Sequence, residues 1–273
     1  MMMATCWGGA GCSDLRSGSM SDLHDLLFFL GQRFVPIIGV PAATWLGQEV
    51  GWRWGFAVVA MLSLLTATLV SLYAPHQPPA KGASPLTELR GLNNRHLWLT
   101  LGISAVGFGG FFTVYTYLAD TLLVVTQAPP SWIPPVFAVF GAGMMIGLMV
   151  VPRFAHRNLM ALAGWLLLWF IATLCLYSFL TENIWTITLA VFLIGLGGAI
   201  GPVLQTRLMD VAGEAQTLAA ALNHSAFNVA NALGPLLGGI AIAHGFGLSS
   251  TGFVGALLAL GGLAIWAIAV RQR

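Results

Sequence analysis

The stretch Asn223–Gly239, NHSAFNVANALGPLLGG, decides how the rest of the chain folds. It lies within the run Ala215–Val270, which contains no Asp, Glu, Lys or Arg and is long enough for two membrane-spanning helices of about 20 residues each. Small residues recur at every fourth position of the stretch, namely Ala226, Ala230, Gly234 and Gly238. Small side chains allow two helix backbones to approach closely in a membrane. We therefore predict a membrane helix with one face packed tightly against a neighbour.

A second face of the same helix carries polar side chains. His224, Asn228 and Asn231 follow the spacing i, i+4, i+7 and therefore share this face. Polar groups at membrane depth normally face a protein interior or a watery cavity. One interpretation is that they line a substrate cavity, together with Thr113 and Thr116 of an earlier apolar segment. The alternative is a packing role, with interhelical hydrogen bonds that contribute about 1 kcal/mol or less each.

The composition identifies an integral membrane protein. Hydrophobic residues make up 58% of the chain and charged residues 7%, whereas soluble domains carry about 25% charged residues. The net charge of +2, without a basic patch interleaved with aromatic residues, argues against nucleic-acid binding. The three cysteines have neither disulfide-framework nor metal-ligand spacing, and no catalytic constellation emerges. We therefore expect neither an enzyme nor a bound metal or cofactor.

Eight apolar segments predict an all-α fold of about eight transmembrane helices. They are Leu26–Val50, Trp54–Tyr73, Leu97–Ala119, Trp132–Val151, Leu159–Leu180, Ile184–Gln205, Leu218–His244 and Thr251–Val270. We expect residues 1–25 to form a polar, poorly ordered leader and residues 26–73 to form two helices. A Pro-rich linker then follows over 74–96, and residues 97–273 form a six-helix bundle.

The distribution of basic residues supports this arrangement. If the linker is cytoplasmic, alternation of the spans places the following residues on the cytoplasmic side: Lys81, Arg90, Arg95, Arg153, Arg157, Arg207, Arg271 and Arg273. Arg53 then lies on the opposite side. This asymmetry is the one that the positive-inside rule requires, so both termini are predicted to be cytoplasmic.

Four segments are similar to motifs of one transporter family. Gly39, Pro41 and Gly47 resemble a glycine and proline antiporter motif in its fifth helix. The order of residues in Asn223–Gly239 resembles its eleventh helix, where the helix-packing positions are Gly234, Pro235, Gly238 and Gly239. Residues 152–157 resemble its loop between helices eight and nine, and residues 74–96 its central linker. The family is the major facilitator superfamily, in its drug:proton antiporter branch with arabinose-efflux-permease-like proteins.

This resemblance implies a twelve-helix fold of which the chain carries helices five to twelve. It implies a proton-coupled secondary transporter, an exporter of small molecules in a bacterial cytoplasmic (inner) membrane, whose partners are its substrate, protons and the lipid bilayer. Such proteins rock one half against the other around a site at the membrane midplane. By resemblance, Arg153 and Arg157 help to hold a cytoplasmic gate shut, although His156 replaces the family's usual acid. The alternative is that their charge only sets the topology. His224 is a candidate proton carrier, and the alternative is a hydrogen-bonded packing residue.

A different class stays open at this point: a non-transporting membrane remnant or assembly partner that lacks a complete pathway. Two helices of one half cannot close a pathway with six helices of the other. We therefore expect the 273-residue chain to be inactive by itself. Gln32 and Arg33 interrupt the first apolar segment, and we expect residues before about Ile38 to come from a shifted reading frame or a misplaced start.

Overall fold

The computed structural model describes residues 39–73, 93–155, 158–213 and 215–272. Within these ranges the chain consists of helices and connecting turns, without a β-strand. In this part of the chain, seven helical stretches are long and apolar enough to cross a membrane. The prediction of an all-α, multi-pass membrane protein is therefore confirmed. Leader residues 1–25, most of the linker and most of the first predicted span lie outside the described residues.

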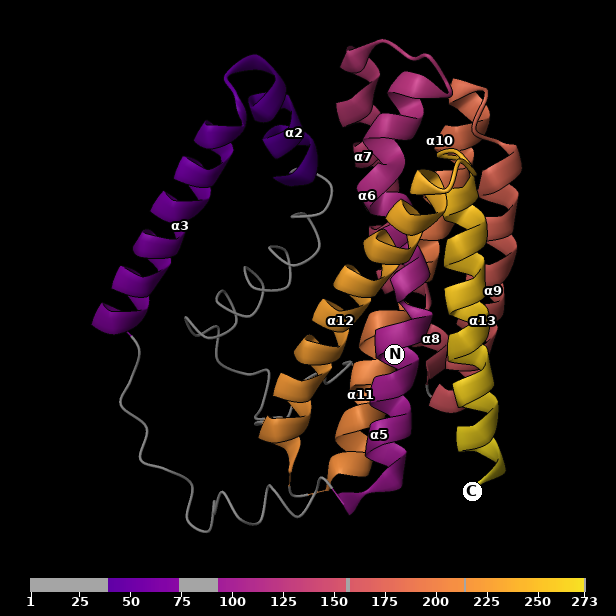
Figure 1. Cartoon of the computed structure of the whole chain (residues 1–273). Helices are drawn as coiled ribbons and strands as arrows, with labels where there is room; N and C mark the ends of the chain where they lie inside the picture. The colour runs from indigo at the N-terminus through magenta and orange to yellow at the C-terminus, as the bar shows by residue number, and fades with distance from the viewer. Residues whose placement is uncertain (1–38, 74–92, 156–157, 214, 273) are drawn as a thin grey trace, which may run out of the picture.

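The described end of that first span forms the ten-residue helix α2 (Val40–Glu49), which makes a hairpin with α3 (Trp52–Tyr73) (Figure 1). The turn uses Gly51, whose φ of +105° is one that L side chains rarely adopt. α2 packs against α7 (Ile133–Val150), and the Gln48 side chain donates a hydrogen bond of 3.3 Å to the carbonyl of Pro130. The large apolar side chains of α3 are exposed, so this helix presents a surface suited to lipid.

The remaining helices pack into a bundle of six spans (Figure 1). In chain order its elements are α5 (Arg95–Gly102), the π-helix η3 (Ile103–Gly107), α6 (Gly109–Val124), the 3-10 turn η4 (Pro130–Trp132), α7, α8 (Pro152–Ala155), α9 (Leu159–Phe179), α10 (Ile184–Gly197), α11 (Ile200–Ala212), α12 (Gln216–Ala243) and α13 (Ser250–Arg271). α5, η3 and α6 together form one span, as do α10 and α11. Each of the six spans predicted after the linker is therefore present, with shifted ends.

Asparagine side chains cap the N-terminal ends of three of these helices. The Oδ1 atoms of Asn94, Asn158 and Asn183 accept hydrogen bonds from backbone N–H groups in the first turns of α5, α9 and α10. Asparagine is among the strongest N-cap residues because its oxygen satisfies an N–H group that has no partner within the helix. Asn94 has a second role, since its Nδ2 donates a hydrogen bond of 2.7 Å to the carbonyl of Val211. This bond ties the start of α5 to the end of α11.

The span from α5 to α6 is longer than the predicted segment Leu97–Ala119, and η3 interrupts its regular helix. The backbone of η3 and of the first turn of α6 crosses that of α13 at very close range. A Cβ atom at Gly107 would lie 3.3 Å from the Cα of Gly262, and one at Gly255 would lie 3.0 Å from the carbonyl oxygen of Gly110. Helix packing at glycine pairs brings two backbones into contact, which a hydropathy pattern does not reveal.

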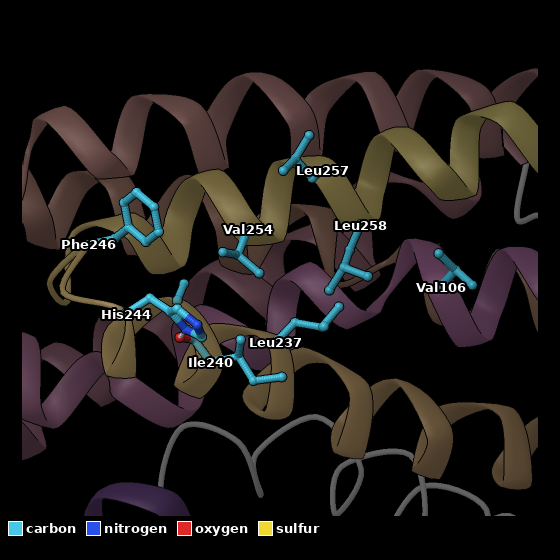
Figure 2. A pocket seen from close by; sticks show the side chains of 9 residues that line it. Val106, Leu237, Ile240, His244, Phe246, Val254, Leu257 and Leu258 are labelled. Atoms are coloured by element: carbon cyan, nitrogen blue, oxygen red, sulfur yellow. Dashed lines mark hydrogen bonds between the residues drawn. The ribbon is translucent and has the colours of Figure 1, made fainter.

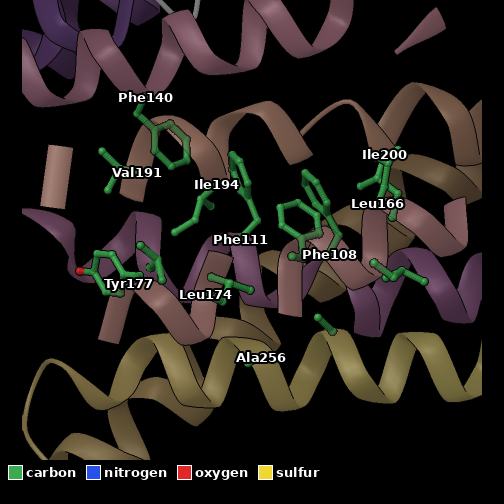
Figure 3. Close-up of a cluster of buried hydrophobic side chains, with 14 of the residues drawn as sticks. Phe108, Phe111, Phe140, Leu166, Leu174, Tyr177, Val191, Ile194, Ile200 and Ala256 are labelled. Atoms are coloured by element: carbon green, nitrogen blue, oxygen red, sulfur yellow. The ribbon is translucent and has the colours of Figure 1, made fainter. Parts of the chain in front are cut away.

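Among its described residues, the bundle contains two separate clusters of buried side chains. The larger one includes a group of aromatic rings (Figure 3), in which the ring centroid of Phe111 lies 4.9 Å from those of both Phe108 and Phe140. The smaller one, the α5–α11–α12 cluster, joins the three helices after which it is named. It consists of Leu97, Leu101, Leu208, Ala212, Ala219 and Ala226.

Candidate functional site

The small-residue face of α12 lies directly against α6. A Cβ atom at Gly234 would collide with the carbonyl oxygen of Gly109 and would lie 2.9 Å from Oγ1 of Thr113. A Cβ atom at Gly238 would lie 2.8 Å from Cγ2 of Thr113 and 3.1 Å from Cε2 of Tyr117. Only glycine fits at such distances, so these two positions set how closely the two helices approach.

A hydrogen bond reinforces this contact. The Tyr117 hydroxyl donates to the carbonyl oxygen of Pro235 at 2.9 Å, and a Cβ atom at Gly239 would lie 2.7 Å from the same hydroxyl oxygen. Pro235 lacks an N–H group, so it cannot make the usual helical bond to the carbonyl of Asn231. The part of α12 that follows Pro235 is thus held on α6, while the helix is weakened just before it.

The polar side chains of α12 lie on a different side. His224, Asn228 and Asn231, here called the α12 polar stripe, are all exposed, whereas Ala226 and Ala230 are buried. Within the described residues the three side chains make no hydrogen bond to another group. The stripe covers seven residue steps, or about 10 Å along the helix axis. It is an extended polar surface at membrane depth, and lipid tails do not solvate such a surface.

The structure separates the two threonines that the sequence grouped with this stripe. Thr113 is fully buried, donates a hydrogen bond of 3.0 Å to the carbonyl of Gly109, and packs against α12. Thr116 is exposed. Tyr117, the neighbour of Thr116, packs at Gly238 of α12. His224 precedes Gly238 by fourteen residues, which is about 20 Å along the helix axis. Thr116 is therefore about this far from His224 along the axis. One small ligand therefore cannot contact both Thr116 and His224.

Two half-buried aromatic side chains meet at Phe108, and sequence reasoning missed them. Phe112 of α6 and Phe227 of α12 both contact Phe108, with ring centroids 5.3 Å and 5.1 Å away. Phe227 immediately precedes Asn228 in α12. Aromatic rings beside amide groups can contact an apolar ligand face while the amides bond its polar edge. The repeated helical spacing of Phe108, Phe111, Phe112 and Tyr115 in the sequence could have indicated this group of aromatic rings.

The remaining predicted site residues lie elsewhere or outside the described ranges. Gly39 precedes the first residue of α2 and Pro41 lies in its first turn, but a Cβ atom at Gly47 would meet no described atom within 4 Å. Within the described chain, Gly47 thus lacks the close packing that the glycines of α12 have. Arg153 is exposed on α8, and Arg157 lies outside the described residues. The assignment of a gate to these two arginines stays a prediction.

An apolar groove lies between α12 and α13, near the Ala243 end of α12 (Figure 2). Its volume is about 520 Å³, and Leu237, Ile240 and Leu258 are among its lining residues. The ring of His244 stands at one end, with its Nδ1 atom 2.8 Å from the carbonyl oxygen of Ile240. Apolar walls suit a lipid chain better than a polar solute. The α12 polar stripe is therefore the better candidate for a solute site.

These features define a multi-pass membrane protein whose helices pack through glycine contacts and expose polar groups at membrane depth. The sequence matches the profile of the Major Facilitator Superfamily over residues 27–166. Inner membrane transport protein YdhP of Escherichia coli K12 is 35% identical over 249 residues, which are 90% of this chain and 63% of that protein. The chain therefore belongs to the Major Facilitator Superfamily.

Two further relatives carry more specific names. A probable sugar efflux transporter of Helicobacter acinonychis is 32% identical over 237 residues, covering 86% of this chain and 60% of that protein. One of Pasteurella multocida is 30% identical over 242 residues, covering 88% of this chain and 59% of that protein. The chain spans about 60% of the length of the curated relatives that it matches.

Proposed function

We propose that the chain is part of a secondary active transporter that exports small molecules across a bacterial cytoplasmic membrane, driven by protons. The observation that carries this proposal is the α12 polar stripe. Its three side chains are exposed at membrane depth and need a polar surrounding, which a water-filled pathway supplies. The printed names of the relatives, an inner membrane transport protein and sugar efflux transporters, support export of a small solute.

The proposed solute site lies between the stripe and the neighbouring aromatic rings. Asn228 and Asn231 offer amide donors and acceptors, and Phe112 and Phe227 offer ring faces. Sugars present both hydroxyl groups and apolar C–H faces, so they match this combination of side chains. We therefore propose a sugar or a similar polyol as the substrate class.

The proposed mechanism is alternating access, in which two helical halves rock about a central site. The contact of α2 with α7 joins the α2–α3 hairpin to the six-span bundle. We propose that residues 26–73 belong to one half and 97–273 to the other, with 74–96 as a cytoplasmic linker and both termini in the cytoplasm. Arg153 and Arg157 then belong to the cytoplasmic gate, and His224 is the proposed proton-coupling residue.

The test uses everted vesicles of the native membrane, so that the chain is assayed together with whatever completes its pathway. The vesicles are energised to build a proton gradient and supplied with radiolabelled mono- and disaccharides. Accumulation that an uncoupler abolishes is the expected result. Replacing Asn228 with alanine should reduce accumulation about tenfold, because one or two hydrogen bonds worth about 0.5–1.5 kcal/mol each are lost. The matched control is Ser225→Ala, since that exposed hydroxyl bonds the Ala221 carbonyl of its own helix at 3.2 Å. Equal activity of both variants contradicts the site.

A second candidate function, a membrane subunit that does not itself transport, is favoured by a different observation. None of the apolar window of α3 is buried, and the α12 polar stripe is uncovered within the described residues. Both surfaces are available to a further helical partner. The distinguishing measurement is the intact mass of the protein extracted from its native membrane, together with any chain that co-purifies. A mass of 28.9 kDa with a stoichiometric partner supports the subunit, whereas a larger single chain supports the transporter.

A further inference from the structure

The buried residue Asn223 has no role in the proposed solute site. Its side chain is 1% exposed, and neither Oδ1 nor Nδ2 has a hydrogen-bond partner within the described chain. An amide group carries two donor hydrogens and an acceptor oxygen, and its burial without partners is unfavourable. Asn223 immediately precedes His224, so its side chain points about 100° round the helix from that of His224.

The surroundings of Asn223 are apolar. Ala219 and Ala226 lie four residues before it and three residues after it, so all three share one helix face. Both alanines belong to the α5–α11–α12 cluster, whose other members include Leu97 and Leu208. The aliphatic members of this cluster offer the amide neither a donor nor an acceptor.

The two ends of α12 are held with very different strength. The Ala243 end is held to α6 by the backbone contact at Gly234 and by the hydrogen bond from Tyr117 to Pro235. At the Gln216 end, α12 contributes two buried alanines and the partly buried Leu222 to the smaller cluster, which is separate from the main core. Small clusters with little buried apolar area are the parts of a fold that open most easily. Pro235 lies between these two parts and weakens the helix there.

We propose that Asn223 acts as a built-in destabilising element that sets how readily the Gln216 end of α12 separates from α5 and α11. Separation gives the amide access to water or to new partners, whereas closure removes that access. Because His224 and Asn228 lie on the same part of α12, this movement also changes the position of the polar stripe. The proposal concerns a local opening equilibrium and holds whether or not the chain transports a solute.

The experiment is hydrogen–deuterium exchange of the full chain in lipid nanodiscs, followed by mass spectrometry of peptides that cover residues 218–230. Asn223→Ala removes the amide and extends the alanine face formed by Ala219, Ala226 and Ala230. We expect exchange about tenfold slower than in the unmodified protein, which corresponds to about 1.4 kcal/mol. Asn223→Asp places a charge among the same apolar side chains, and we expect faster exchange. Peptides covering residues 236–243 should change little.

Asn228→Ala and Asn228→Asp are the matched controls, because Asn228 is exposed on the same helix. They correct for the higher helix propensity of alanine, which slows exchange at any exposed position. Exchange in Asn223→Ala that is no slower than in Asn228→Ala overturns the proposal. Loss of the folded elution peak in Asn223→Ala also overturns the proposal, because the amide would then stabilise the structure. Exchange in Asn223→Asp that is no faster than in Asn228→Asp also contradicts it.

Discussion

Replacing Gly234 with alanine should push α12 away from α6. The new Cβ atom would collide with the carbonyl oxygen of Gly109 and would lie 2.9 Å and 3.0 Å from Oγ1 and N of Thr113. Two of these three atoms are backbone atoms, so they cannot turn aside as the end of a flexible side chain could. The two helices must separate, and the hydrogen bond between Tyr117 and Pro235 is lost as they do.

The magnitude follows from three contributions. Overpacking costs about 1–3 kcal/mol, and backbone obstruction places this site at the upper end. The lost hydrogen bond adds about 0.6 kcal/mol, a typical value between membrane helices. The higher helix propensity of alanine restores about 1 kcal/mol of the free energy of unfolding. The net loss is about 2.5 kcal/mol, which lowers the melting temperature by about 5–10 °C for a chain of this size.

The assay is thermal unfolding of the purified full chain in one detergent, followed by circular dichroism and by the amount of monodisperse protein that remains after heating. The matched control is Gly102→Ala in the same bundle, where a Cβ atom would lie at an ordinary 3.6 Å from the Ile265 side chain. That variant should melt at or above the temperature of the unmodified protein. If Gly234→Ala melts as high as Gly102→Ala, the close contact between α6 and α12 is not present in the protein.

Three further predictions concern the same bundle. Tyr117→Phe removes only the hydrogen bond to Pro235, so its melting temperature should fall by about 1–3 °C, clearly less than for Gly234→Ala. Asn94→Ala removes both the cap of α5 and the hydrogen bond to Val211, and should lower the free energy of unfolding by about 1–2 kcal/mol in the same melt. Asn94→Asp keeps the cap and should recover part of that loss. Phe227→Ala should weaken sugar binding, measured by scintillation proximity with labelled ligand, and should leave the elution profile unchanged; unaltered affinity would remove this ring from the proposed site.

The seven spans of the described chain and their order could be predicted from the sequence, because helix length and apolar composition are local properties. The faces of α12 are equally local. The 3.6-residue period separates Ala226, Ala230 and Gly234 from His224 and Asn228 without any knowledge of the neighbouring helices. The glycine and proline motifs likewise resembled one family, and the match over residues 27–166 confirms membership of the Major Facilitator Superfamily.

Other features depended on contacts between residues far apart in the chain, and only the tertiary structure decided them. Thr113 and Thr116 are three residues apart, so periodicity places them on one helix face and does not say which of them meets α12. The packing at Gly234 buries Thr113 and leaves Thr116 exposed. In the same way, Asn223 differs from Asn228 only in its angle on the helix. The cluster formed by α5 and α11 buries one of them and leaves the other exposed, because burial depends on which neighbour covers each face.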